Sequence, residues 1–135
     1  MGKTIEELLQ TPCWIIDILP KQVPKDRQGQ YFRMEDFFLQ GENRSAVKQK
    51  HLNLILKLNC YLDVSLDEDG GLNPPPEQIA DTVFRRYTCI RIADAMLLSE
   101  PDDTHMTLFN PNEELLELIK ALASGEGLFV WQPQF

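Results

Sequence analysis

Apolar and polar residues alternate through residues 87–109, and this pattern predicts two strands joined by an acidic turn. One side of the predicted ribbon carries apolar residues that Asp94 interrupts: Ile90, Ile92, Met96 and Leu98. The turn, residues 99–104, contains one proline and three carboxylates. These residues favour chain reversal, because proline fixes φ and Asp side chains bond nearby backbone. We therefore expect a β-hairpin against which the flanking segments bury their apolar faces.

Two segments of the N-terminal half have the apolar spacing of amphipathic helices. Residues 4–10 begin with Thr4 and Glu7 at the spacing of a capping box. Residues 45–58 carry one apolar stripe: Val47, His51, Leu54, Ile55 and Leu58. Because His51 lies on this stripe, it is predicted to be a hydrogen-bonded core residue. The lysines at 48, 50 and 57 are predicted to face water.

Two more helices are predicted in the C-terminal half. Residues 77–87 follow three prolines, and proline is favoured in the first turn of a helix. Residues 110–113, Asn-Pro-Asn-Glu, predict a helix that is capped by Asn110 and ends at Ser124 and the glycine that follows it.

Three apolar runs predict further strands. Residues 13–19 are bounded by prolines and contain several β-branched side chains, which predicts a strand buried on both faces. Residues 60–62 and 128–131 predict shorter strands. Residues 31–34 look extended, and residues 35–39 look like one or two helical turns.

Together these elements predict a single α+β domain over residues 1–135, with a small, mainly antiparallel sheet and helices packed largely on one face. A length of 135 residues suits one domain. A parallel β-α-β pair is an alternative around the last helix, because short connections join that helix to a strand on either side.

The charge is unevenly distributed along this acidic chain, whose net charge is −8. Residues 1–60 carry nine Lys and Arg against seven Asp and Glu, whereas residues 61–135 carry four against fourteen. An acidic half disfavours nucleic acid, which is bound through phosphate neutralisation by Lys and Arg. It suits a basic protein partner or, more simply, solubility.

The three cysteines favour a reducing compartment. Cys13, Cys60 and Cys89 are odd in number and form no C-x-x-C pair, so neither a disulfide framework nor a metal or redox motif is indicated. Each has apolar neighbours and is predicted to be a buried thiol. No apolar run approaches the ~20 residues that cross a bilayer, and the N-terminal segment lacks the pattern of a signal peptide. We expect a cytoplasmic protein without membrane contact.

The acidic turn concentrates candidate chemistry in six residues: Glu100, Asp102, Asp103 and His105. Such a set could hold a divalent metal or pair a general base with an acid. Neighbouring turn residues point in different directions, however, and no second histidine motif supplies ligands. The acidic loop at 67–71 also lacks the spacing of a calcium loop. We therefore expect no metal or other cofactor, and we take Glu100, Asp102 and Asp103 as candidate contacts to a basic partner.

Asp17 and Asp94 each interrupt a predicted apolar strand. A buried carboxylate must be paired or shift its pKa, and two such groups on neighbouring strands could form an acid–base pair. Alternatively, each lies at a strand edge or pairs with an arginine such as Arg33 or Arg91. Aromatic residues offer a further candidate surface, either a ligand or partner groove or ordinary core: Trp14, Tyr31, Phe32, Phe37, Phe38 and Trp131.

Two classes of function remain. The first is a non-catalytic binding or accessory protein that acts through its acidic C-terminal half on a basic partner. The second is a small enzyme or ligand-binding protein that uses Asp17, Asp94 or His105 in a pocket. Motifs such as HExxH, GxSxG and a glycine-rich phosphate loop are absent from the sequence, which favours the first class. Both aspartates in one pocket would favour the second class, and both exposed would favour the first.

Overall fold

One antiparallel sheet organises the part of the chain that the computed structural model describes, residues 4–22, 29–67 and 71–133. Its elements in chain order are α1 (Ile5–Leu8), β1 (Cys13–Asp17), α2 (Gln30–Phe38), α3 (Gly41–Asn59), β2 (Val64–Leu66), α4 (Pro76–Arg85), β3 (Thr88–Ile92), β4 (Ala95–Ser99), β5 (His105–Phe109), α5 (Glu113–Gly125) and β6 (Phe129–Trp131). The strands lie in the order β2-β3-β4-β5-β1-β6, and each is antiparallel to its neighbours.

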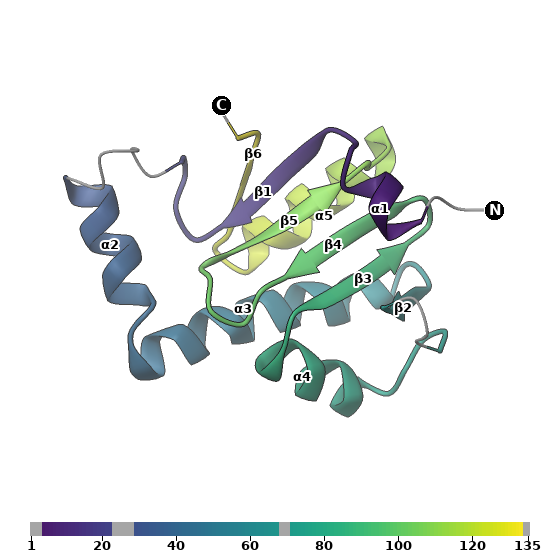
Figure 1. Ribbon diagram of the computed structural model, residues 1–135, viewed down its shortest axis with the longest axis horizontal. Coiled ribbons are helices and arrows are strands. Elements are labelled where there is room, and N and C mark those ends of the chain that lie inside the picture. Colours follow the sequence, from purple (N-terminus) through teal and green to yellow (C-terminus); the bar gives the residue numbers. More distant parts are fainter. Residues whose placement is uncertain (1–3, 23–28, 68–70, 134–135) are drawn as a thin grey trace.

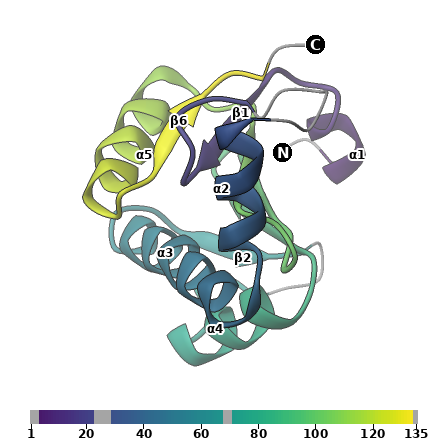
Figure 2. The ribbon, with the colours of Figure 1, turned by 90° about the vertical axis from the view of Figure 1, so that its left-hand side faces the viewer.

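The helices are distributed unequally over the two faces of this sheet. Helices α3, α4 and α5 cover one face, while the short α1 lies on the other (Figures 1 and 2). Alternate strand residues and helix stripes meet in the main core, which includes Leu54, Ile79, Ile90, Leu97, Met106 and Ile119. On the opposite face, Leu8 of α1 packs with Met96 and Phe109 in a smaller cluster. The α+β fold with helices largely on one face is thus confirmed.

The predicted single hairpin is in fact a three-stranded meander. A tight turn at Ala93 and Asp94 separates β3 from β4, and Ile92 pairs with Ala95 across it. The face assignment was therefore wrong for β4, because Leu97 and not Met96 shares the core face with Ile92. Ala93 adopts the positive φ, 52°, that such a turn requires. The turn therefore lacks the Asn-Gly or Asp-Gly sequence that usually signals it.

Several predicted boundaries also move. Helix α2 begins at Gln30, so residues 31–34 are helical and not extended. Aromatic residues favour strands only where they can pack against a neighbouring strand, and these residues have no such neighbour among the described strands. Helix α3 begins four residues before Ser45, and residues 60–62 form its terminal turn instead of a strand. The side chain that caps α5 belongs to Asn112, which accepts from the N–H of Leu115 at 2.8 Å.

Helix α5 connects two strands that run in the same direction without touching. Strand β1 lies between β5 and β6 and is antiparallel to both, so β5 and β6 are parallel to each other. The alternative of a directly paired parallel β-α-β unit is therefore not formed. Instead, the N-terminal strand separates the last two strands of the chain.

Candidate functional site

A buried lysine holds the acidic turn between β4 and β5. Lys48 of α3, only 2 % exposed, donates to the Ser99 hydroxyl at 2.8 Å and to the Glu100 carbonyl at 3.1 Å. Burial lowers the pKa of Lys48 to about 8, although Asp103, Glu100 and Asp102 oppose the shift. The prediction that Lys48 faces water was wrong, because its stem lies along the core and its ammonium reaches the backbone of the turn.

His51 continues the same anchor one helical turn further along α3. Its Nε2 lies 3.0 Å from the Thr104 carbonyl, and its Nδ1 lies 3.2 Å from Lys48 Nζ. Since a carbonyl only accepts, Nε2 carries the proton and Nδ1 accepts from the ammonium. Burial, reinforced by the charge of Lys48, lowers the pKa of His51 to about 3. The prediction of a hydrogen-bonded core histidine is confirmed, and both ring nitrogens are committed to structure.

The acidic side chains of the turn differ in their exposure and in the contacts that they already make. Asp102 is the outermost: its side chain is 85 % exposed, and it pairs with the Arg44 guanidinium at 3.4 Å. Glu100 accepts from the exposed Tyr87 hydroxyl at 2.7 Å, and this hydrogen bond raises the pKa of Tyr87. Asp103 is half-buried. The turn is thus held from inside by Lys48 and from outside by Tyr87 and Arg44.

Asp103, His105 and Asp17 form a second titratable group on the face of the sheet away from the main helix layer. Asp103 Oδ1 lies 2.8 Å from His105 Nδ1 and also accepts from the Thr104 N–H at 2.8 Å. Burial alone would lower the pKa of His105, but the Asp103 carboxylate raises it overall. The same contact outweighs burial and lowers the pKa of Asp103.

Asp17 lies directly opposite His105 in the β1–β5 ladder and is 4 % exposed. Burial raises the pKa of Asp17, against the lowering effect of the Leu19 N–H that its Oδ1 accepts and of the charge of His105. The prediction of a buried carboxylate in this strand is thus correct, but a histidine and not an arginine faces it.

Asp94 does not join Asp17. It is exposed in the turn between β3 and β4, where its carbonyl accepts from the Asn110 side chain at 3.0 Å. Asn110 follows β5, whereas Asp17 faces His105 at the start of β5, so the two aspartates lie at opposite ends of the strands. The predicted acid–base pair is therefore wrong. Asp17 is buried and Asp94 is exposed, so the structure shows neither both aspartates in one pocket nor both aspartates exposed.

The acidic turn also has the composition of a small metal site. Ligand atoms of Glu100, Asp103 and His105 lie within 4.8 Å of one another. The charges of Asp103 and Glu100 already act on the Lys48 ammonium, and the His105 Nδ1 is already bonded to Asp103. We therefore assign this group a structural role. In the loop after β2, Asp67 accepts from the Cys89 N–H at 3.0 Å, while Asp69 lies outside the described residues.

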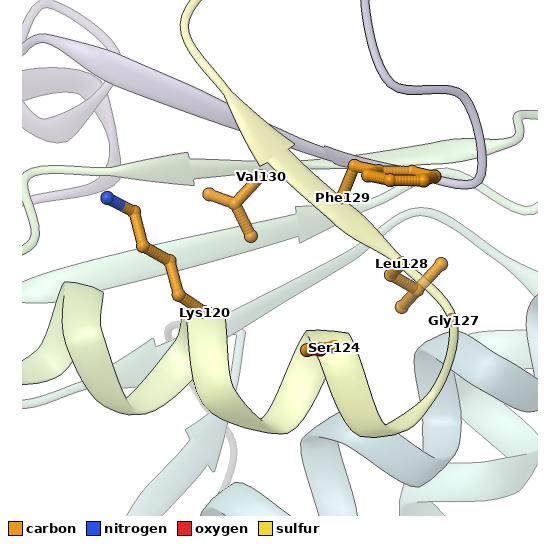
Figure 3. Close-up of a pocket in the computed structure, with 6 residues that line it drawn as sticks. All are labelled: Lys120, Ser124, Gly127, Leu128, Phe129 and Val130. Atoms are coloured by element: carbon orange, nitrogen blue, oxygen red, sulfur yellow. The ribbon is translucent and has the colours of Figure 1, made fainter.

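Three hollows in the surface lie away from this cluster. One of about 330 Å³ lies between α5 and β6 and is lined by Lys120, Ser124, Gly127, Leu128, Phe129 and Val130 (Figure 3). A second, of about 270 Å³, lies beside Phe38 where α2 meets α3. A third, of about 180 Å³, is lined by Asp94 and Asn112. None of the three is lined by Asp17 or His105, so these two residues share no hollow with Asp94.

Sequence reasoning missed Lys48, although a signal was present. Lys48 precedes His51 by three residues and therefore shares its face of the helix. No acidic residue lies three or four positions away from Lys48 on the helix. A basic residue next to a core histidine and without such a neighbour points to a partner elsewhere in the chain.

Comparison with known proteins identifies no relative: no family model, curated protein or solved structure matches the chain. Among the described residues, no helix combines the length and apolar character needed to cross a bilayer.

Proposed function

We propose that this protein is a non-catalytic binding protein that engages a basic protein partner through one end of the molecule. The observation that carries the proposal is the anchoring of the acidic turn by Lys48. A buried ammonium bonded to Ser99 and to the Glu100 carbonyl fixes the turn before any partner arrives. Preorganisation of this kind strengthens binding, because less conformational entropy is lost on association.

Exposed aromatic and apolar side chains accompany the charge at this end. Helix α2 stands away from the sheet near the β4–β5 turn (Figure 1), and none of its described side chains is fully buried. Phe37 is 56 % exposed, and Met34 and Tyr87 are exposed as well. Aromatic residues and Met are enriched in protein interfaces, where they form anchors, while carboxylates steer a basic partner.

The geometry argues against the enzymatic alternative. Ser99 lies 2.8 Å from a lysine of lowered pKa, a pairing that can activate a hydroxyl nucleophile. Both side chains are buried beneath the turn, so a substrate would have to displace it. Asp17 is buried and faces His105 across the β1–β5 ladder, whereas the half-buried His105 has its Nδ1 bonded to Asp103. We propose structural roles for all of them.

We also place the protein in the cytoplasm and expect it not to bind nucleic acid. None of the three cysteines forms a disulfide, which suits a reducing compartment. The net charge is −8, because Lys and Arg are outnumbered by Asp and Glu, so few cations are available to neutralise phosphate. Retardation of DNA or RNA by the protein at physiological salt would contradict this part of the proposal.

The test compares three versions of the full chain as bait in a native lysate. Wild type is set beside a surface variant, Asp102→Asn with Phe37→Ala, and a matched control, Glu114→Gln with Leu72→Ala. Each pair removes one exposed carboxylate and one exposed apolar side chain. A protein retained by wild type and control but lost by the surface variant is the predicted partner.

The purified partner then decides the mechanism. It is expected to be basic, and its on-rate should fall as salt rises, because screening weakens electrostatic steering. The charge change at Asp102 should lower the on-rate, and loss of Phe37 should mainly raise the off-rate. An acidic partner, or one whose affinity is equal for the surface variant and the control, refutes the proposal.

A further inference from the structure

The two edges of the sheet are protected to different degrees. Strand β2 forms one edge, where Leu72 bridges to Ser65 and where Asp63 and Asp67 flank the strand. Flanking charge and cover of this kind discourage pairing with another chain. Strand β6 forms the other edge, and no described strand lies beyond it. Its segment, residues 127–132, contains no charged side chain.

The β6 edge also has an empty space beside it. The hollow of about 330 Å³ opens between this strand and α5, with Val130 and Lys120 on its walls (Figure 3). Side chains alternate across a strand, so a strand added next to β6 would direct every second residue toward the helix layer. Within the part of the chain that the structure describes, the edge therefore offers backbone groups that pair with no further strand, and room for inward-facing side chains.

We propose that β6 pairs with β6 of a second copy, antiparallel and about a two-fold axis at Val130. In this register Val130 faces its own counterpart, and Phe129 of each copy faces Trp131 of the other. The sequence Phe-Val-Trp is thus self-complementary in side-chain type, as an isologous interface requires. Phe129 is 48 % exposed in the single chain, and aromatic cross-strand pairs are favourable.

Charge makes this edge the suitable place for two acidic chains to meet. Lys120 is the charged residue that lines the hollow, and nearby Glu126 is paired with Lys57 and accepts from Asn53. The surroundings of β6 are therefore locally balanced in a molecule of net charge −8. Salt should strengthen the dimer by screening the remaining repulsion, whereas it should weaken binding of a basic partner.

The contact is expected to be reversible. A three-residue strand with its flanks covers less than the ~800 Å² per partner of a stable complex, so dimerisation should depend on protein concentration. This inference does not rest on the proposed function, because it uses a different surface and has the opposite salt dependence.

Sedimentation of the full chain over a wide concentration range tests the dimer. Wild type should shift from monomer to dimer, more readily at high salt. Phe129→Lys should remain monomeric at concentrations where Leu72→Lys, the same change on the β2 edge, dimerises like wild type. Thermal melting of each variant establishes that it is folded. A wild type that stays monomeric throughout, or a dimer equally formed by Phe129→Lys, overturns the proposal.

Cross-linking tests the register independently of any folding defect at Phe129. Opposed residues of an antiparallel pair have Cα atoms ~4.5–5.5 Å apart, within disulfide range. In a Cys60→Ser background, which removes the exposed native thiol, Val130→Cys should give a covalent dimer on mild oxidation. Leu72→Cys in the same background should give far less. Equal yields from the two variants overturn the two-fold pairing at Val130.

Discussion

Replacing Lys48 by Met gives the most direct test of the anchor beneath the acidic turn. Methionine keeps much of the volume of the lysine stem but removes the ammonium that donates to Ser99 and to the Glu100 carbonyl. It also removes the donor near His51 Nδ1. The variant thus trades a buried charge for two buried acceptors and one half-buried carbonyl that have lost a donor.

The two effects can be compared in magnitude. Burial lowers the pKa of Lys48 from 10.5 to about 8, which corresponds to roughly 3 kcal/mol at ~1.4 kcal/mol per pKa unit. Removing the ammonium relieves that penalty at neutral pH. Each buried acceptor left without a donor costs ~1–3 kcal/mol, so the two buried acceptors together with the half-buried Glu100 carbonyl outweigh the relief. We expect Lys48→Met to be less stable than wild type at pH 7 by a few kcal/mol, and the turn to loosen.

The pH dependence of the unfolding free energy gives a prediction whose direction is fixed by the lowered pKa of Lys48. Between pH 8 and pH 10.5 the unfolded chain still holds the Lys48 proton, whereas the folded chain has released it. Stability rises with pH wherever the unfolded state binds more protons. Wild type therefore gains stability across this window, and the variant lacks this contribution. The difference in unfolding free energy between them should widen by up to roughly 3 kcal/mol from pH 8 to pH 10.5.

Urea unfolding followed by tryptophan fluorescence measures this difference directly. Lys50→Met, which removes a lysine from the same helix, is the control, and its pH dependence is subtracted from that of Lys48→Met. Ionisation of tyrosines and thiols is common to all three proteins and cancels. A gap between wild type and Lys48→Met that stays constant or narrows from pH 8 to pH 10.5 would refute the argument that a buried ammonium anchors the turn.

Two further predictions concern the histidines and the thiols. Nitrogen-detected NMR should show His51 neutral and protonated on Nε2 down to about pH 5, while His105 titrates above the ordinary histidine pKa because of its carboxylate partner; titration of His51 near pH 6.5 would contradict its assigned hydrogen bonds. Native protein should react quickly with a thiol reagent at the exposed Cys60 and more slowly at the half-buried Cys13 and Cys89, and burial also raises the pKa of Cys13. Equal rates at all three would contradict the exposure of Cys60, at which the prediction of a buried thiol was wrong.

Local periodicity accounts for much of what the sequence could predict. The stripe on α3, the capping box at Thr4 and the buried carboxylate at Asp17 all follow from the identity of near neighbours. The mixture of predicted strands and helices was enough to predict the α+β fold class. These features depend on spacing along the chain, which a single sequence displays.

The residues that were misplaced depend on contacts distant in sequence or on unusual turn geometry. Asp94 was assigned to a strand because Ala93 adopts a positive φ without the usual turn residues. Lys48 was assigned to water because its partner Ser99 is 51 residues away. His105 could not be matched to Asp17 until the β1–β5 register was known. Pairing of this kind is set by the whole sheet and leaves no local signature.

The position of β1 between β5 and β6 has a consequence for the order of folding. The strand is synthesised before both of its ladder neighbours, β5 and β6, and the Trp131 indole N–H donates to the Leu19 carbonyl across 112 residues. Long-range closure of this kind is slow, because chain entropy is lost before the contacts that reward it are made. On the ribosome, β1 must therefore wait unpaired, with its apolar residues available to chaperones, until β5 and β6 have emerged.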